Sequence, residues 1–108
     1  MDTTSLKEKR NQLIKKLFKL GPAILRGSFV KKYRRCGKAN CHCASEGQGH
    51  ESYYLSVSMP GRSPIMIYVS LAKKDMVKEA LANYQNAQQI IEEISNINRE
   101  MLSQKEIL

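Results

Sequence analysis

The last third of the sequence contains neither glycine nor proline, from Ala72 to Leu108. These residues interrupt helices most often, glycine because it is too flexible and proline because it lacks an amide proton. Ser70, just before this stretch, has a hydroxyl of the kind that caps a helix N-terminus. The sequence therefore predicts one very long C-terminal helix beginning at about Ala72.

Within this predicted helix, apolar residues recur at the seven-residue spacing of a coiled coil. The two repeating positions hold Val77, Tyr84, Ile91, Asn98 and Lys105 in one series and Ala80, Ala87, Ile94, Met101 and Leu108 in the other. Such a helix extends roughly 50 Å at about 1.5 Å per residue, which exceeds the width of a globule of this size. Part of its apolar stripe therefore needs a partner beyond a small sheet.

Two partners can cover this stripe. An N-terminal helix can pack antiparallel along one stretch, but it is only about half as long, so we expect a second copy of the chain to form a homodimer. The expected self-association residues are Val77, Tyr84, Ile91, Ile94, Asn98 and Met101, with Asn98 fixing the register. The alternative is a helix that breaks near Asn96 and Asn98 and folds back within a monomer.

Residues 5–20 show helical spacing of apolar side chains, with lysines mostly on the other face. Ser5 and Glu8 match a capping box, and Gly21-Pro22 supplies the stop. The sequence therefore predicts a basic amphipathic helix that packs on a core.

Three segments between the helices favour strands. Residues 28–35 are rich in β-forming side chains, although Phe29 and Tyr33 leave a helix open there. Residues 53–59 and 64–70 alternate apolar and polar side chains around turn residues, which predicts a hairpin. We therefore expect an α+β fold that is one compact unit, with a basic helix and β domain over 1–70 and the long helix over 71–108.

Positive charge is concentrated in the N-terminal third. Residues 1–38 carry twelve Lys and Arg against two acidic residues, a net +10, while residues 39–108 carry six against eight, a net −2. Such a concentration favours a polyanionic partner, most simply nucleic acid. The candidate phosphate contacts are Lys31, Lys32, Arg34, Arg35, Lys38 and Arg62. Tyr33, Tyr53, Tyr54 and Tyr68 lie near them in the sequence and are candidates for stacking on bases. The alternative is that the tyrosines belong to the core and that the basic residues form a solvated strand edge.

A cluster of cysteines follows the basic segment with the spacing C-x4-C-x-C-x6-H. Cys36, Cys41, Cys43 and His50 form a complete set of thiolate and imidazole ligands, which predicts one structural Zn²⁺ per chain. His42 competes as a ligand, but it lies between two cysteines. The alternative is a reactive thiol at Cys36, whose pKa neighbouring basic residues would lower.

The sequence resembles a widespread family of short, uncharacterised prokaryotic proteins associated with transposases and other mobile elements. The resemblance lies in Arg26 to Val30, Tyr33 to Ala44, Gly49-His50 and Tyr53 to Ser56. Members often have Gly-Pro where this chain has Glu51-Ser52. The resemblance implies a module similar to a zinc finger, in a mobile-element context.

The pattern of residues argues against catalysis and against membranes. No paired carboxylates, phosphate-binding glycine loop or Ser/His/Asp set is present in the sequence. No apolar run is long enough for a bilayer, and the N-terminus lacks a signal-peptide pattern. We therefore expect a cytoplasmic, zinc-stabilised nucleic-acid-binding accessory or regulatory protein, with DNA favoured over RNA. The alternative is an adaptor whose long helix engages a transposase, recombinase or other protein.

Overall fold

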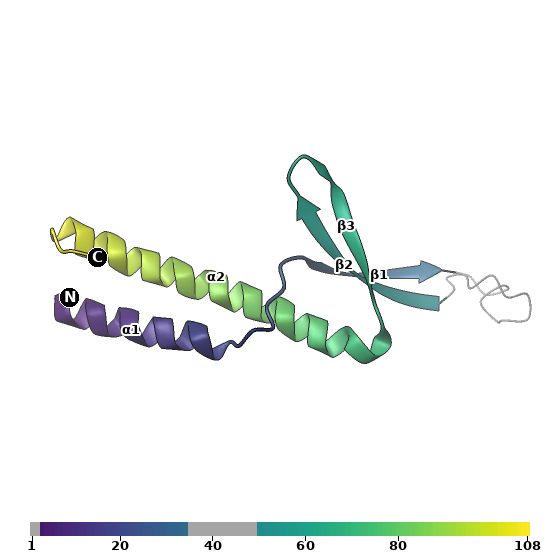
Figure 1. Ribbon diagram of the computed structural model, residues 1–108, viewed down its shortest axis with the longest axis horizontal. Coiled ribbons are helices and arrows are strands. Elements are labelled where there is room, and N and C mark those ends of the chain that lie inside the picture. The colour runs from purple at the N-terminus through teal and green to yellow at the C-terminus, as the bar shows by residue number, and fades with distance from the viewer. Residues whose placement is uncertain (1–2, 35–49) are drawn as a thin grey trace, which may run out of the picture. The chain divides into compact units, whose positions relative to one another are not determined.

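The structure is a computed structural model that describes residues 3–34 and 50–108. It confirms the α+β class, with one long helix before and one after three strands in the order of the sequence (Figure 1). The elements in chain order are α1 (Thr3–Lys19), β1 (Ser28–Arg34), β2 (His50–Met59), β3 (Arg62–Val69), the short 3-10 helix η2 (Leu71–Lys73) and α2 (Lys74–Ser103).

Contacts divide the chain into two units. One contains Met1–Ile24 with Ala82–Leu108, and the other contains Leu25–Leu81. Helix α2 begins in the second and ends in the first. This grouping differs from the expected division after residue 70, because α1 packs on the C-terminal part of α2.

The helical unit is held by one apolar cluster. Its buried members are Leu6, Leu13, Ile90, Ile97 and Met101. Leu6 and Leu13 are seven residues apart on α1, as are Ile90 and Ile97 on α2, so each pair lies on one face of its helix. The Thr3 hydroxyl lies 3.1 Å from Gln104 Oε1, which brings the start of α1 to the end of α2. The helices therefore pack antiparallel, as expected for one stretch of the stripe.

Helix α2 is continuous from Lys74 to Ser103, so the alternative of a break at Asn96 and Asn98 is wrong. The predicted helix nevertheless ends five residues before the C-terminus. Lys105 has a left-handed φ of 61°, and the Glu106 amide donates to the Met101 carbonyl at 2.9 Å. These are the features of a Schellman C-cap, which stops the helix without glycine.

The helix starts also differ in detail from the predictions. Helix α1 begins at Thr3, so Ser5 lies in its first turn and is not the N-cap. Ser70 precedes η2 with extended backbone, but its side chain makes no capping hydrogen bond. Apolar spacing predicted both helices correctly, whereas the capping residues misplaced their starts.

The sheet is antiparallel in the order β1-β2-β3. Residues 28–34 form a strand, which excludes the helix left open there, and Met59 and Arg62 flank the hairpin turn. The buried cluster of this unit contains Tyr53, Leu55, Val69 and Val77. Since Val77 belongs to α2, the first turns of that helix cover one face of the sheet.

Gly27 permits the close approach of the chain just before β1. Its φ is +151°, and a Cβ there would lie 2.8 Å from the Ser56 carbonyl oxygen and 2.9 Å from Leu55 Cδ1. The next strand residues can then place Phe29 against Tyr53, with ring centroids 5.4 Å apart. Only glycine fits this position without a shift of the backbone.

Candidate nucleic-acid interface

Strand alternation gives the sheet two different faces. The covered face holds Tyr53, Leu55 and Val69, which are buried against α2. Register pairs Val30 with Tyr54, Lys32 with Ser52, Tyr54 with Tyr68 and Ser56 with Met66, which places these residues on the other face. We call this the open face and define it by Val30, Lys32, Ser52, Tyr54, Ser56, Met66 and Tyr68.

The open face carries an aromatic pair beside a lysine. The rings of Tyr54 and Tyr68 meet edge to face, with centroids 5.9 Å apart and an interplanar angle of 72°. Lys32 Nζ lies 5.5 Å from the centre of the Tyr54 ring. Tyr68 is 66% exposed and Met66 is 41% exposed. Apolar and aromatic surface is thus available to a ligand on this face.

The predicted phosphate contacts do not form one cluster. Lys32 and Arg62 are both exposed, but only Lys32 alternates onto the open face, because a register shift in the hairpin pairs Arg62 with Met59. Their register partners on β2, Ser52 and Met59, are seven residues apart, which corresponds to about 23 Å along a strand. Arg34 ends β1, while Arg35 and Lys38 lie outside the described residues.

Lys31 is on the opposite face and has an acidic partner. Its Nζ lies 3.7 Å from Glu51 Oε1, and the Tyr53 hydroxyl donates to Glu51 Oε2 at 2.8 Å. The Tyr53 hydrogen bond and then the charge of Lys31 lower the pKa of Glu51, so its carboxylate is held in the charged form. The same hydrogen bond raises the pKa of Tyr53. Lys31 is therefore partly neutralised, which its place in a basic run did not indicate.

Tyrosine roles also divide by face. Tyr53 is 8% exposed and belongs to the core, as one reading of the sequence expected. Lys74 Nζ lies 4.8 Å from its ring centre, and Lys78 Nζ lies 5.0 Å from that of Phe29. These two lysines of α2 pack over covered-face aromatics, a role the sequence analysis missed.

Helix α1 presents a second basic surface, in the helical unit. Its exposed lysines are Lys7, Lys9, Lys15, Lys16 and Lys19, and its one acidic residue is Glu8. None of these lysines has an ion pair among the residues that the structure describes. Their charge is therefore available to solvent or to a polyanion.

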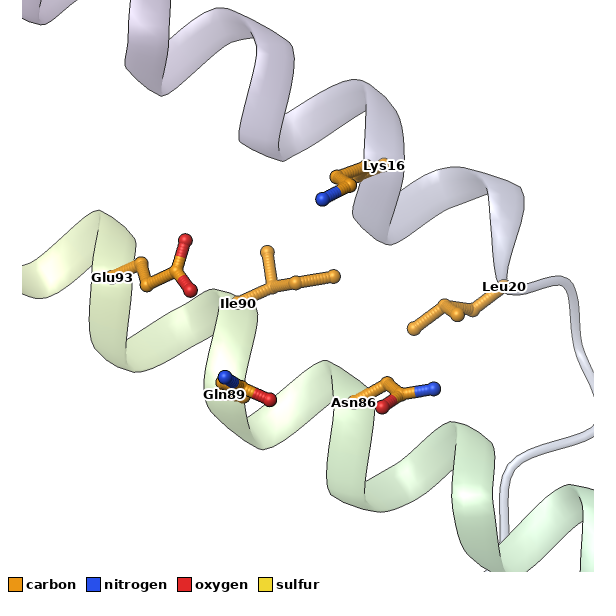
Figure 2. A pocket seen from close by; sticks show the side chains of 6 residues that line it. All are labelled: Lys16, Leu20, Asn86, Gln89, Ile90 and Glu93. Carbon is orange, nitrogen blue, oxygen red and sulfur yellow. The ribbon is translucent and has the colours of Figure 1, made fainter.

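Two shallow grooves lie between α1 and α2. The first has a volume of 330 Å³ and is lined by Lys16, Leu20, Asn86, Gln89, Ile90 and Glu93 (Figure 2). The second has a volume of 420 Å³ and shares Lys16 and Glu93 with the first. Their polar groups are amides, the ammonium groups of Lys9 and Lys16 and the carboxylate of Glu93, with no nucleophile and base set among them. The grooves suggest no catalytic chemistry.

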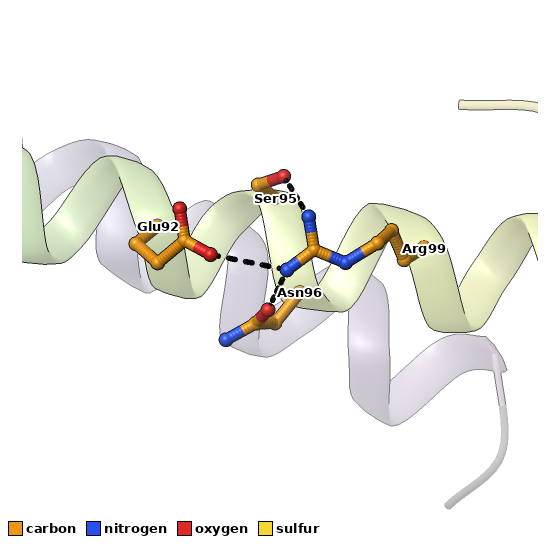
Figure 3. A network of polar contacts seen from close by, with 4 residues as sticks. All are labelled: Glu92, Ser95, Asn96 and Arg99. Atoms are coloured by element: carbon orange, nitrogen blue, oxygen red, sulfur yellow. Dashed lines mark hydrogen bonds and ion pairs between the residues drawn. The ribbon is translucent and has the colours of Figure 1, made fainter.

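Arg99 illustrates a basic residue that is already engaged. Its guanidinium donates to Ser95 Oγ at 2.8 Å, to Glu92 Oε1 at 3.1 Å and to Asn96 Oδ1 (Figure 3). All four residues lie on α2, within eight positions of one another. This local network uses the donors that a phosphate would need.

The predicted metal ligands are only partly described. His50 is the first residue of β2, is exposed, and pairs in register with Arg34, the last residue of β1. Cys36, Cys41 and Cys43 lie outside the described residues. Within residues 3–34 and 50–108, no three His, Cys, Asp or Glu side chains come together. The zinc site therefore stays a prediction.

The predicted self-association residues have several different environments. Val77 is buried under the sheet, Met101 is fully buried in the helical core, and Ile94 packs partly against that core. Asn98 accepts a hydrogen bond within the chain, whereas Ile91 is 54% exposed. The Tyr84 hydroxyl accepts a hydrogen bond from Gln88 at 3.3 Å. Much of the stripe is therefore used inside the chain, and the dimer stays a prediction.

Comparisons with known proteins give one match. The family described as a domain of unknown function (DUF6788) matches residues 3–79. No curated protein and no solved structure matches the chain. Neither described helix has the length and apolar content needed to span a membrane. The match fits the expected uncharacterised family and leaves its function to be inferred from the residues.

Proposed function

The chain belongs to the DUF6788 family, a domain of unknown function, and we propose that it is a small nucleic-acid-binding protein. The proposal is drawn from its residues, because the family match carries no function. The observation that carries the proposal is the charge distribution, a net +10 over residues 1–38 against −2 over the rest. The described basic side chains of β1 and α1 are mostly exposed, which makes this charge accessible. Binding rather than catalysis is proposed because the chain lacks a recognisable catalytic set.

Lys32 and Arg62 are the strongest candidates for phosphate contacts among the described strand residues. Both are exposed, and neither has an acidic partner among the residues that the structure describes. Lys31 is weaker, because Glu51 already balances its charge. Each phosphate contact releases condensed counterions, so affinity should fall with salt.

Zinc is part of the proposal, through Cys36, Cys41, Cys43 and His50. Three thiolates and one imidazole form a closed tetrahedral set, which suits a structural ion. Arg34 and His50 are register partners, so the chain ends that flank residues 35–49 are neighbours. That proximity favours closure of the segment around one ion.

The biological role that we propose follows from the resemblance to proteins associated with mobile elements. The protein would act as an accessory or regulator of a mobile element, with DNA as the favoured target and a homodimer as the active form. The second candidate is a protein-interaction adaptor. Ile91 and Leu102 of α2 are 54% and 63% exposed, and this apolar surface favours it.

Salt titration of binding tests the proposal. The probes are duplex DNA, single-stranded DNA and structured RNA at low and moderate salt, measured by fluorescence anisotropy. Lys32→Ala with Arg62→Ala should weaken binding and reduce the salt slope by up to about two units. Lys31→Ala is the matched control for Lys32→Ala alone, with the same loss of one positive charge but at a paired lysine, and should have the smaller effect of the two. If the wild type binds none of the probes at low salt, the adaptor becomes the better proposal.

A further inference from the structure

The open face combines a pair of tyrosines, of which Tyr68 is exposed and Tyr54 half-buried, with a positive charge. Tyr68 is 66% exposed, although it lies on β3 and next to another tyrosine on the central strand. Tyr53, one position from Tyr54, is 8% exposed because α2 covers its face. The core therefore does not account for Tyr68, whose ring surface remains accessible.

The charge on the open face is positive. It comes from Lys32, which lies beside the ring of Tyr54. The three described strands contain one acidic residue, Glu51, and it lies on the covered-face side with Lys31 and Tyr53. The open face is thus complementary to an anionic ligand.

We infer that the open face binds single-stranded nucleic acid, with bases stacked on Tyr68 and Tyr54 and the phosphate backbone near Lys32. This inference rests on the proposed function and names its partner class. Aromatic side chains that receive bases, flanked by cations that follow the backbone, are what single-strand recognition requires. In a duplex the base faces are already stacked on one another, so the tyrosine rings would have no base to receive.

Charge also selects against the other occupant of such a face, a second copy of the chain. Pairing two open faces would bring Lys32 of each copy against a surface without acidic groups. A nucleic-acid strand instead supplies both the negative charge and the planar rings.

The test compares Tyr68→Ala with Tyr33→Ala in the full chain. Tyr33 is 45% exposed and lies on the covered-face side, where its hydroxyl is near Glu51. Tyr33→Ala therefore removes the same side chain as Tyr68→Ala but leaves the open face unchanged. The probes are a labelled dodecamer of thymidylate and a duplex of the same length, both at low salt. Tyr68→Phe is included because a phenyl ring retains stacking without the hydroxyl.

The inference expects Tyr68→Ala to weaken oligothymidylate binding by about tenfold or more. Tyr33→Ala and Tyr68→Phe should change that affinity less than about threefold, and duplex binding should change little with any of them. Because Tyr68 is exposed, thermal melting of Tyr68→Ala should match that of the wild type, which separates lost stacking from lost folding.

Other outcomes overturn the inference, and they can be told apart. Single-strand binding that Tyr68→Ala leaves unchanged, or a preference for duplex over oligothymidylate, contradicts the inference while the proposed function stands. A shift of Tyr68→Ala from dimer to monomer without a change in binding assigns the open face to self-association. Absence of binding to either probe at low salt removes the proposed function as well.

Discussion

Arg10 Nη1 donates a hydrogen bond to Asn98 Oδ1 at 2.9 Å, joining α1 to α2 across 88 positions of the sequence. The same nitrogen donates to the Leu108 carbonyl oxygen at 2.9 Å. Asn98 was expected to fix the register of a dimer. In this structure its side-chain oxygen joins one helix of the chain to the other, and the dimer register stays a prediction.

Arg10→Ala should lower the free energy of unfolding by about 1 kcal/mol, because it removes charge-assisted hydrogen bonds at a partly exposed position. For a chain of this size the melting temperature should fall by roughly 4–8 °C. Thermal denaturation followed by circular dichroism measures the change, with Lys9→Ala as the exposed control. In a double-mutant cycle with Asn98→Ala, a coupling energy near zero would contradict the assigned contact.

Gly27→Ala should destabilise the sheet unit by about 1–3 kcal/mol. The added Cβ would meet the backbone oxygen of Ser56 at 2.8 Å, and the positive φ of +151° is unfavourable for alanine. Urea denaturation measures the loss, and Ser28→Ala at the exposed neighbouring position is the control. An unchanged midpoint for Gly27→Ala would mean that the chain here can shift without cost.

Ile91→Asp tests self-association better than a change at Ile94. Ile91 is 54% exposed, whereas Ile94 packs against the helical core, so only the former leaves the fold of the chain intact. Light scattering of the wild type should give about twice 12.3 kDa, and Ile91→Asp should shift it toward the monomer. Glu92→Asp, an exposed and charge-neutral change, serves as the control. A wild type that is already monomeric would contradict the dimer.

Cys41→Ser should reduce bound zinc from about one equivalent per chain toward zero and destabilise the segment around it. Elemental analysis of protein purified without added metal measures the stoichiometry. Ser45→Ala, a nearby change outside the ligand set, should retain the metal. If the wild type holds no zinc and Cys41→Ser melts at the same temperature, the cysteines have another role.

Local patterns in the sequence predicted both α-helices and favoured the three strands that the structure describes, but they did not predict the 3-10 helix Leu71–Lys73. The stretch without Gly or Pro after Ala72 produced α2, because nothing in it interrupts backbone hydrogen bonding. Alternation over residues 53–59 correctly separated the buried Tyr53 and Leu55 from Tyr54 and Ser56. Helix and strand periodicity act over a few residues, so a single sequence contains them.

Only tertiary structure decided which residue each face would meet. Lys31 and Lys32 are adjacent and chemically identical, yet the strand register places one beside Glu51 and the other beside Tyr54. The stripe of α2 likewise divides, with Val77 packing under the sheet and Met101 against α1. Such partners lie tens of residues away along the chain. Their choice depends on how whole elements pack, which no local pattern of side chains encodes.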